Sequence, residues 1–157
     1  MQARIDVTVA AVIEQSGRYL LVEERVGDTL VFNQPAGHLE PGESLLEAIV
    51  REVGEETGFA FHPHALVGVY LWQCAAERSY LRACFMGRAD PPAAAPRLDE
   101  GIVATHWLTR EQLLHPKRAL RSPLVLRCID DFRGGASFPL ECLRHVAPEE
   151  LATARLA

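Results

Sequence analysis

Apolar and β-branched runs separated by turn-forming residues dominate the first part of the chain. Residues 5–13 and 19–23 are two such runs, and the segment between them, Glu-Gln-Ser-Gly-Arg, favours a turn. We therefore expect these two strands to pair as a hairpin. A short strand or loop follows at residues 30–32, and Pro35 interrupts it because proline has no amide hydrogen to donate to a sheet.

A second strand pair is predicted at residues 66–74 and 79–88, where larger and smaller side chains alternate. Successive side chains of a strand point to opposite faces of the sheet, so Tyr80 and Arg82 should share one face. If that face borders a cleft, Arg82 points into it.

The clearest helix covers residues 44–57. Ser44 and Glu47 form an S-x-x-E capping box, which satisfies free amides at the start of a helix. Gly58 occupies the position where helices commonly end in a left-handed residue. An apolar stripe predicts that one side of this helix packs on a sheet, and it consists of Leu46, Ile49, Val50 and Val53.

The remaining part of the chain predicts a loop, one strand and two helices. Closely spaced prolines at residues 90–96 favour a loop that is too short to separate two domains. A strand covers residues 102–108, and a short helix follows at 109–114. A last helix covers residues 123–132, and Gly134 with the next glycine stops it.

Three acidic side chains, Glu52, Glu55 and Glu56, occupy one face of the first helix because their spacing is i, i+3 and i+4. Like charges this close destabilise a helix unless a cation accepts their oxygens, and Mg²⁺ or Mn²⁺ suits clustered carboxylates. For an isolated glutamate-rich helix the alternative is a solvated face with weak ion pairs. The residues around the helix decide between these interpretations.

The segment from Gly37 to Phe59 matches the pattern GX5EX7REUXEEXGU at every specified position, where U is a bulky apolar residue. A match of this length is much more specific than a glycine motif alone. On these residues the chain resembles the Nudix hydrolase family. The resemblance implies an α/β fold, the Nudix α/β/α sandwich with a central mixed sheet and a loop-helix-loop that carries the motif. We expect a single domain of this kind over residues 1–157.

The resemblance assigns roles to the motif residues. Arg51 should pair with Glu43 and complete the catalytic set by holding a glutamate in place, and Gly58 should support the motif by ending the helix. Glu55 or Glu52 should remove the proton of the attacking water, because the base differs among members of the family. The cofactor should be Mg²⁺, with Mn²⁺ as a substitute, and its ligands should be Glu52, Glu55, Glu56 and the carbonyl of Gly37.

A distal acidic ligand is common in the family, about six residues before the tryptophan that is Trp107 here. That position holds Gly101, and Asp99 and Glu100 lie just upstream. The identity of the distal ligand therefore stays open.

Three further segments, at residues 32–40, 120–125 and 139–141, are similar to the NudJ-type Nudix phosphatases of bacteria. This similarity implies release of monophosphate from nucleoside tri- and diphosphates and from thiamine-type pyrophosphates. One alternative is a house-cleaning nucleotide pyrophosphohydrolase that releases pyrophosphate. Another is a non-catalytic nucleotide-binding Nudix module, and the complete glutamate set counts against it because a binding module needs no water-activating base.

Four residues outside the motif are candidates for substrate binding. Arg82 and Arg121 can hold phosphate oxygens through charge-assisted hydrogen bonds, although exposed arginines are usually solvated surface. Phe32 and Trp72 can stack on a base or pyrimidine ring, although large aromatic residues on strands more often pack in the core.

The composition of the 157 residues fits one globular domain, because 48% are hydrophobic and the chain is too short for two ordinary domains. The net charge of −5 argues against a nucleic-acid partner, so we expect a small-molecule substrate.

We find no signal-peptide pattern and no apolar run long enough for a bilayer, and we expect a cytoplasmic protein without a membrane partner. The four cysteines lack CxxC spacing, so we expect reduced, buried thiols. A monomer and a homodimer are equally compatible with the sequence.

Overall fold

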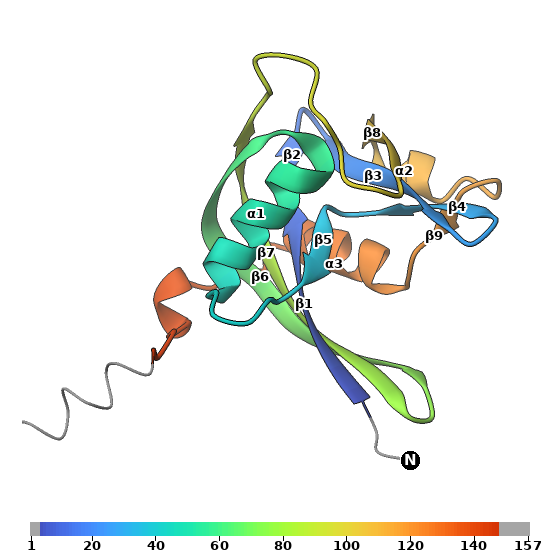
Figure 1. Cartoon of the computed structure of the whole chain (residues 1–157). Helices are drawn as coiled ribbons and strands as arrows, with labels where there is room; N and C mark the ends of the chain where they lie inside the picture. Colours follow the sequence, from blue (N-terminus) through green and yellow to red (C-terminus); the bar gives the residue numbers. More distant parts are fainter. Residues whose placement is uncertain (1–3, 148–157) are drawn as a thin grey trace, which may run out of the picture.

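The computed structural model of the protein describes residues 4–147, and strands make up most of the ordered elements in that range (Figure 1). Three α-helices and one 3₁₀ helix accompany them. In chain order the elements are β1 (Arg4–Val12), β2 (Glu14–Gln15), β3 (Arg18–Val26), β4 (Thr29–Asn33), β5 (Ala36–His38), α1 (Leu45–Thr57), β6 (Ala60–Ala75), β7 (Arg78–Asp90), β8 (Ile102–Leu108), α2 (Arg110–Leu113), β9 (Ala119–Leu120), α3 (Leu124–Arg133) and the 3₁₀ helix η1 (Leu140–Cys142).

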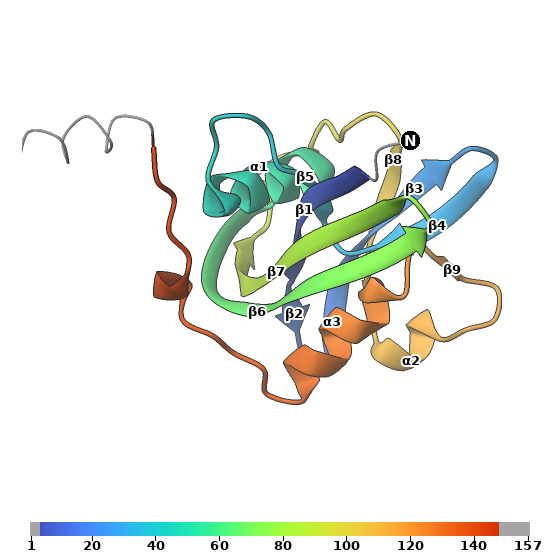
Figure 2. The same ribbon diagram turned by 90° about the horizontal axis from the view of Figure 1, so that it is seen from below.

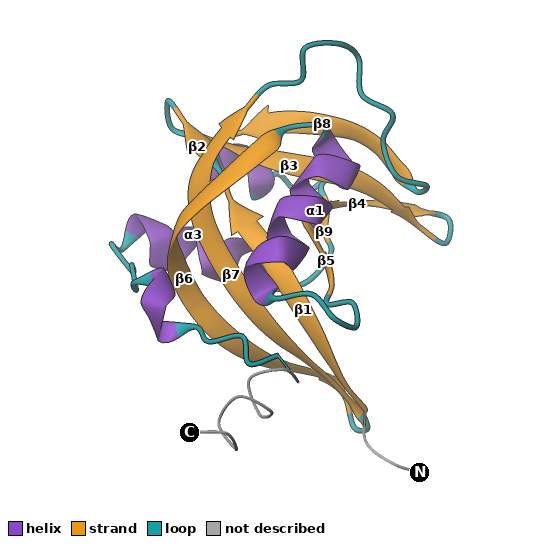
Figure 3. Ribbon diagram, turned by 60° about the vertical axis from the view of Figure 1, so that its left-hand side comes forward, coloured by secondary structure: helices purple, strands orange, loops and turns teal. Residues whose placement is uncertain are grey.

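The strands form two sheets. The first has the order β5-β1-β7-β6, in which β1 and β7 are parallel and the other pairs are antiparallel. In the second, β3 pairs with β2, β4 and β8, and β9 joins β4 in parallel. Figure 3 shows that β1, β6 and β7 run on together past the helices. The expected central mixed sheet is therefore divided into two sheets.

Helices cover both faces of the first sheet, with α1 on one side and α3 on the other (Figure 2). Alternate side chains of β1 point to opposite faces of the sheet. Val9 and Ala11 pack with α1, whereas Ala10 and Val12 pack with α3. These residues are almost completely buried because β1 is an inner strand with both faces covered. The predicted α/β fold, with a sheet layer between helices, is confirmed.

The expected hairpin between residues 5–13 and 19–23 is wrong in its extent. Both strands exist, but β1 lies in the first sheet and β3 in the second. Only β2 and the start of β3 form a hairpin, around Ser16 and Gly17, which both have positive φ angles of 52° and 76°. The chain crosses between sheets at Ile13, because the doubly apolar β1 needs burial on both faces and finds it beside β7.

The other predicted elements are present, with different limits. α1 has the capping box of Ser44 and Glu47, and Gly58 ends it with a φ of 76°. The second strand pair is antiparallel as expected, but β6 begins at Ala60 and passes through Pro63. That proline is tolerated because β6 is an edge strand and its register shifts there.

All four cysteines are free thiols, as expected. Cys84 and Cys128 are buried, but Cys74 and Cys142 are exposed, which corrects the expectation that all would be buried. Between residues 4 and 147, no helix has the length and apolar character needed to cross a bilayer.

Candidate active site

A single open cavity of about 590 Å³ gathers most of the predicted site residues, and we call it the main pocket. One wall is the acidic face of α1 together with β5. The other walls come from β1, β3, β4, β6 and β7, from the start of α3, and from loop positions that include Asp99 and Arg121. Its volume is in the range of small-molecule sites.

Helix α1 and strand β5 are in very close contact at Gly37. A Cβ atom at this glycine would lie 2.0 Å from Cδ of Glu52, so no other residue fits without moving the carboxylate. One turn further along α1, Oε2 of Glu56 accepts a hydrogen bond from the backbone amide of Ala36, at 2.9 Å. The fold therefore places two glutamates of the motif directly against the backbone of β5.

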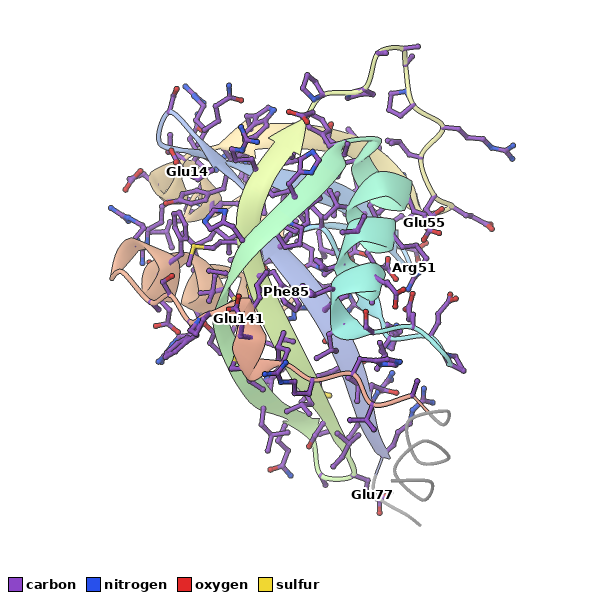
Figure 4. The ribbon with its side chains drawn as sticks, turned by 90° about the vertical axis from the view of Figure 1, so that its left-hand side faces the viewer. Glu14, Arg51, Glu55, Glu77, Phe85 and Glu141 are labelled. Carbon is purple, nitrogen blue, oxygen red and sulfur yellow. The ribbon has the colours of Figure 1, made fainter. Side chains whose placement is uncertain are left out.

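Arg51 connects the acidic residues of the motif. Its guanidinium donates to both carboxylate oxygens of Glu43, at 2.6 and 3.0 Å, as the resemblance implies. Nη1 also donates to Glu52 at 2.8 Å and to Glu55 at 3.0 Å. These bonds raise the pKa of Arg51, and Figure 4 shows Arg51 and Glu55 projecting from the same side of α1. Arg51 thus holds two of the three helical glutamates in place.

Burial makes ionisation of the pocket acids difficult. It raises the pKa of Glu52 above its ordinary value and raises the pKa of Glu56 to about 9. For Glu56, the amide of Ala36 opposes the effect of burial and the negative charge of Glu52 adds to it. Burial likewise raises the pKa of Glu24, another acid of the main pocket. A cation in the pocket would favour the charged forms of these carboxyls.

The donor set of the pocket fits a hard divalent cation, because it offers carboxylate oxygens beside the close backbone approach at Gly37. The side chains do not converge as the sequence predicted. Within residues 4–147, no three His, Cys, Asp or Glu side chains are grouped around one point. Arg51 engages Glu52 and Glu55, while Glu56 turns to the amide of Ala36.

Asp99, and not Glu100, is the acid that reaches the main pocket. The amide of Asp99 donates to the carbonyl of Glu55 at 3.0 Å, and its negative charge contributes to the raised pKa of both Glu52 and Glu56. The spacing to Trp107 could not distinguish the two acids, because the chain turns at Gly101, which has a φ of 93°, and spacing alone does not say which neighbour of a turn faces the pocket.

Three of the four residues predicted to bind the substrate lie at the main pocket, and one does not. Arg82, Arg121 and Trp72 line the main pocket. Phe32 is absent from its lining and packs in the core, with its ring 5.4 Å from that of His106. The aromatic neighbour of Trp72 is instead Tyr80, and their rings stack at 5.7 Å with an interplanar angle of 20°.

Among the polar residues of the pocket, sequence reasoning missed Thr8, Glu24 and Asn33. Thr8 interrupts the apolar run at residues 5–13, and this was the available signal. Glu24 and Asn33 lie near the ends of strands, where polar residues are usually solvated. Their residue types and positions in the sequence therefore gave no indication of burial.

Comparisons with known proteins agree with this geometry. A family model described as NUDIX domain matches residues 3–128. The chain is 36% identical to "Phosphatase NudJ" of Escherichia coli strain K12 over 137 residues, which covers 87% of this chain and 89% of that protein.

Solved structures give the same result. A "NUDIX hydrolase from Nitrosomonas europaea" is 46% identical, with a TM-score of 0.86, and the match covers 91% of this chain and 98% of that one. The NUDIX domain of Shewanella oneidensis NrtR, solved with ADP ribose, has a TM-score of 0.66 at 17% identity, covers 84% of this chain and 88% of that one, and shows the fold alone. The chain therefore belongs to the Nudix family and is a hydrolase that acts on phosphoanhydrides.

Proposed function

We propose that the protein is a Mg²⁺-dependent phosphatase of nucleoside tri- and diphosphates and of thiamine-type pyrophosphates. The observation that carries this proposal is the motif geometry: Arg51 bridges Glu43, Glu52 and Glu55 beside Gly37, at the wall of a cavity large enough for a nucleotide. Similarity to the NudJ phosphatase supports release of monophosphate. The free cysteines support a cytoplasmic location.

In this proposal the cation is held by Glu52, Glu55, Glu56 and the carbonyl of Gly37, with Asp99 as the distal acid. When bound, Mg²⁺ or Mn²⁺ neutralises phosphate charge and makes water more acidic. Two of these glutamates differ in exposure. The side chain of Glu55 is 43% exposed, and that of Glu52 is 10% exposed.

Proton removal from the attacking water falls to Glu55 or Glu52. Both carboxylates accept a hydrogen bond from Arg51, which fixes their position. Arg51 does not need to touch the substrate to do this, and we assign it a positioning role. Arg121 and Arg82 contact the substrate from the opposite wall, and the stacked pair of Trp72 and Tyr80 offers a flat aromatic surface.

The proposal is tested by phosphate release from a panel of nucleotides and thiamine pyrophosphates, measured with Mg²⁺ and again with EDTA. We expect phosphate only with Mg²⁺, and Glu55→Gln and Glu56→Gln should each fold but lose at least about a hundredfold in turnover. Near-wild-type turnover in either variant removes the role of that residue. Adding inorganic pyrophosphatase identifies the product: if phosphate appears only then, the enzyme releases pyrophosphate and the phosphatase assignment is wrong.

A further inference from the structure

Four buried polar atoms in residues 4–147 lack a hydrogen-bond partner, and all four belong to residues that line the main pocket. They are Oγ1 of Thr8, Oε1 of Glu24, Oδ1 of Asn33 and Nε of Arg82. Leaving such atoms unpaired is costly, and native proteins rarely do so without a reason. Because all four atoms belong to one pocket, a bound ligand can supply their missing hydrogen-bond partners.

Both sheets contribute to this cluster. Thr8 and Arg82 are neighbours on β1 and β7, paired in register, while Glu24 and Asn33 come from β3 and β4. Thr8, Asn33 and Arg82 are 6%, 5% and 7% exposed, so they form the inner end of the pocket. The exposed Glu55 on α1 marks the outer, catalytic side.

The unpaired atoms define the ligand that fits them. Oδ1 of Asn33 has no partner, and as an amide oxygen it can only accept a hydrogen bond. Nε of Arg121 lies 3.3 Å from Oε1 of Glu24, an ion pair without the geometry of a hydrogen bond, and its charge opposes the effect of burial by favouring the carboxylate form of Glu24. Nε of Arg82 can only donate. The inner end therefore requires a group with two polar hydrogens close to one acceptor.

A phosphate group does not meet this requirement, because its oxygens would face the acceptors of Glu24 and Asn33. An amino-substituted nitrogen heterocycle does, since its amino group supplies two hydrogens and the adjacent ring nitrogen accepts one. The stacked rings of Trp72 and Tyr80 line the same pocket and suit a flat ring. An oxo heterocycle such as uracil would place carbonyl oxygens against the acceptors.

We propose that Thr8, Glu24, Asn33 and Arg82 form a specificity subsite that binds the amino-bearing edge of a nitrogen heterocycle, as in cytosine, adenine or an aminopyrimidine. The inference rests on the proposed function, because it takes the other end of the substrate to be the phosphoanhydride. It assigns Arg82 to the ring and leaves Arg121, whose side chain is 44% exposed, for the phosphates.

The test measures binding of CMP and UMP by calorimetry in EDTA, where hydrolysis plays no part, alongside kcat/KM for CTP and UTP with Mg²⁺. We expect CMP to bind at least about tenfold more tightly than UMP, and CTP to be preferred by a similar factor. Equal affinity for the two, or no measurable binding of either, overturns the subsite. Selective binding of CMP without any Mg²⁺-dependent hydrolysis leaves the subsite standing and refutes the proposed function.

Three variants sharpen the test. Glu24→Gln should lower the CMP-to-UMP ratio at least about fivefold, because its amide can donate to an oxo group. Glu23→Gln is the matched control, since Glu23 is the preceding residue of β3 and contacts His106 instead, and the CMP-to-UMP ratio of this variant should stay at the wild-type value. Thr8→Val removes a hydroxyl that has no partner, so it should weaken CMP binding at least about fivefold without lowering the melting temperature. Unchanged CMP binding in Thr8→Val and an unchanged ratio in Glu24→Gln overturn the assignment.

Discussion

Replacement of Gly37 by alanine is the most direct perturbation of the proposed metal-binding residues on α1 and β5. The added Cβ would lie 2.0 Å from Cδ of Glu52 and 2.1 and 2.2 Å from its two carboxylate oxygens. Ordinary contact begins at 3.4 Å, so the carboxylate must retreat by about 1.4 Å. Because the clash involves the end of a flexible side chain, the backbone of β5 and α1 can stay in place.

The expected result is a folded protein with a damaged site. A misplacement of about 1 Å at a catalytic group can cost about a hundredfold in rate, which corresponds to about 2.7 kcal/mol in the activation free energy. We therefore expect Gly37→Ala to lose at least about a hundredfold in kcat/KM. Steady-state phosphate release and thermal unfolding, measured on the same preparation, separate loss of activity from loss of stability.

Gly54→Ala is the matched control, because Gly54 lies in the middle of α1 and a Cβ there meets no atom within 4 Å. Alanine is favoured over glycine inside a helix by about 1 kcal/mol, so this variant should melt about 2–4 °C higher and keep wild-type activity. The steric reasoning is refuted if Gly37→Ala keeps its rate within about threefold, or if Gly54→Ala loses as much activity as Gly37→Ala.

Two further predictions concern the distal acid and acid stability. Asp99→Asn should lower kcat at least about tenfold in the Mg²⁺ assay, whereas Glu100→Gln, outside the main pocket, should not; equal rates would exclude Asp99 as a ligand. A hydrogen bond from Arg110 lowers the pKa of Asp130 below 3.8, so its contribution to stability is present above that pH and is lost as the pH falls through the folded-state value. In urea unfolding, wild type should therefore lose more stability than Asp130→Asn between about pH 5 and about pH 3, and parallel losses would contradict this sign.

Local patterns predicted the elements whose ends are marked by chemistry. α1 could be placed because Ser44 and Gly58 define its two ends, and the second strand pair because its residues alternate. The hairpin of the first two strands was misjudged, since the sequence near residue 13 does not say which sheet each strand joins. β1 lies between β5 and β7, and its parallel pairing with β7, far along the chain, leaves no local signal.

The site shows the same division between local and long-range information. The motif predicted the acidic wall of the main pocket because its residues lie on one short segment, which consists of β5, the following loop and α1. Phe32 and Trp72 could not be distinguished, because each is a large aromatic residue on a strand and only the strand's partners decide which face is buried. Thr8 could be read as important only once β1 was known to be an inner strand, where a polar side chain needs a partner.

The residues that we propose for catalysis and for substrate selection come from separate elements. Arg51 and the three motif glutamates that we propose as metal ligands come from α1, whose position depends on its contact with β5 and on the apolar residues Val9 and Ala11 of β1. Thr8 points to the other face of β1, so a change there alters the inner end of the pocket without disturbing the surface that supports α1. Substitutions at the inner end can therefore change which ring is accepted while the geometry around Arg51 stays the same. If selection and catalysis were instead coupled, Thr8→Val would lower turnover on every substrate by the same factor, whatever ring the substrate carries.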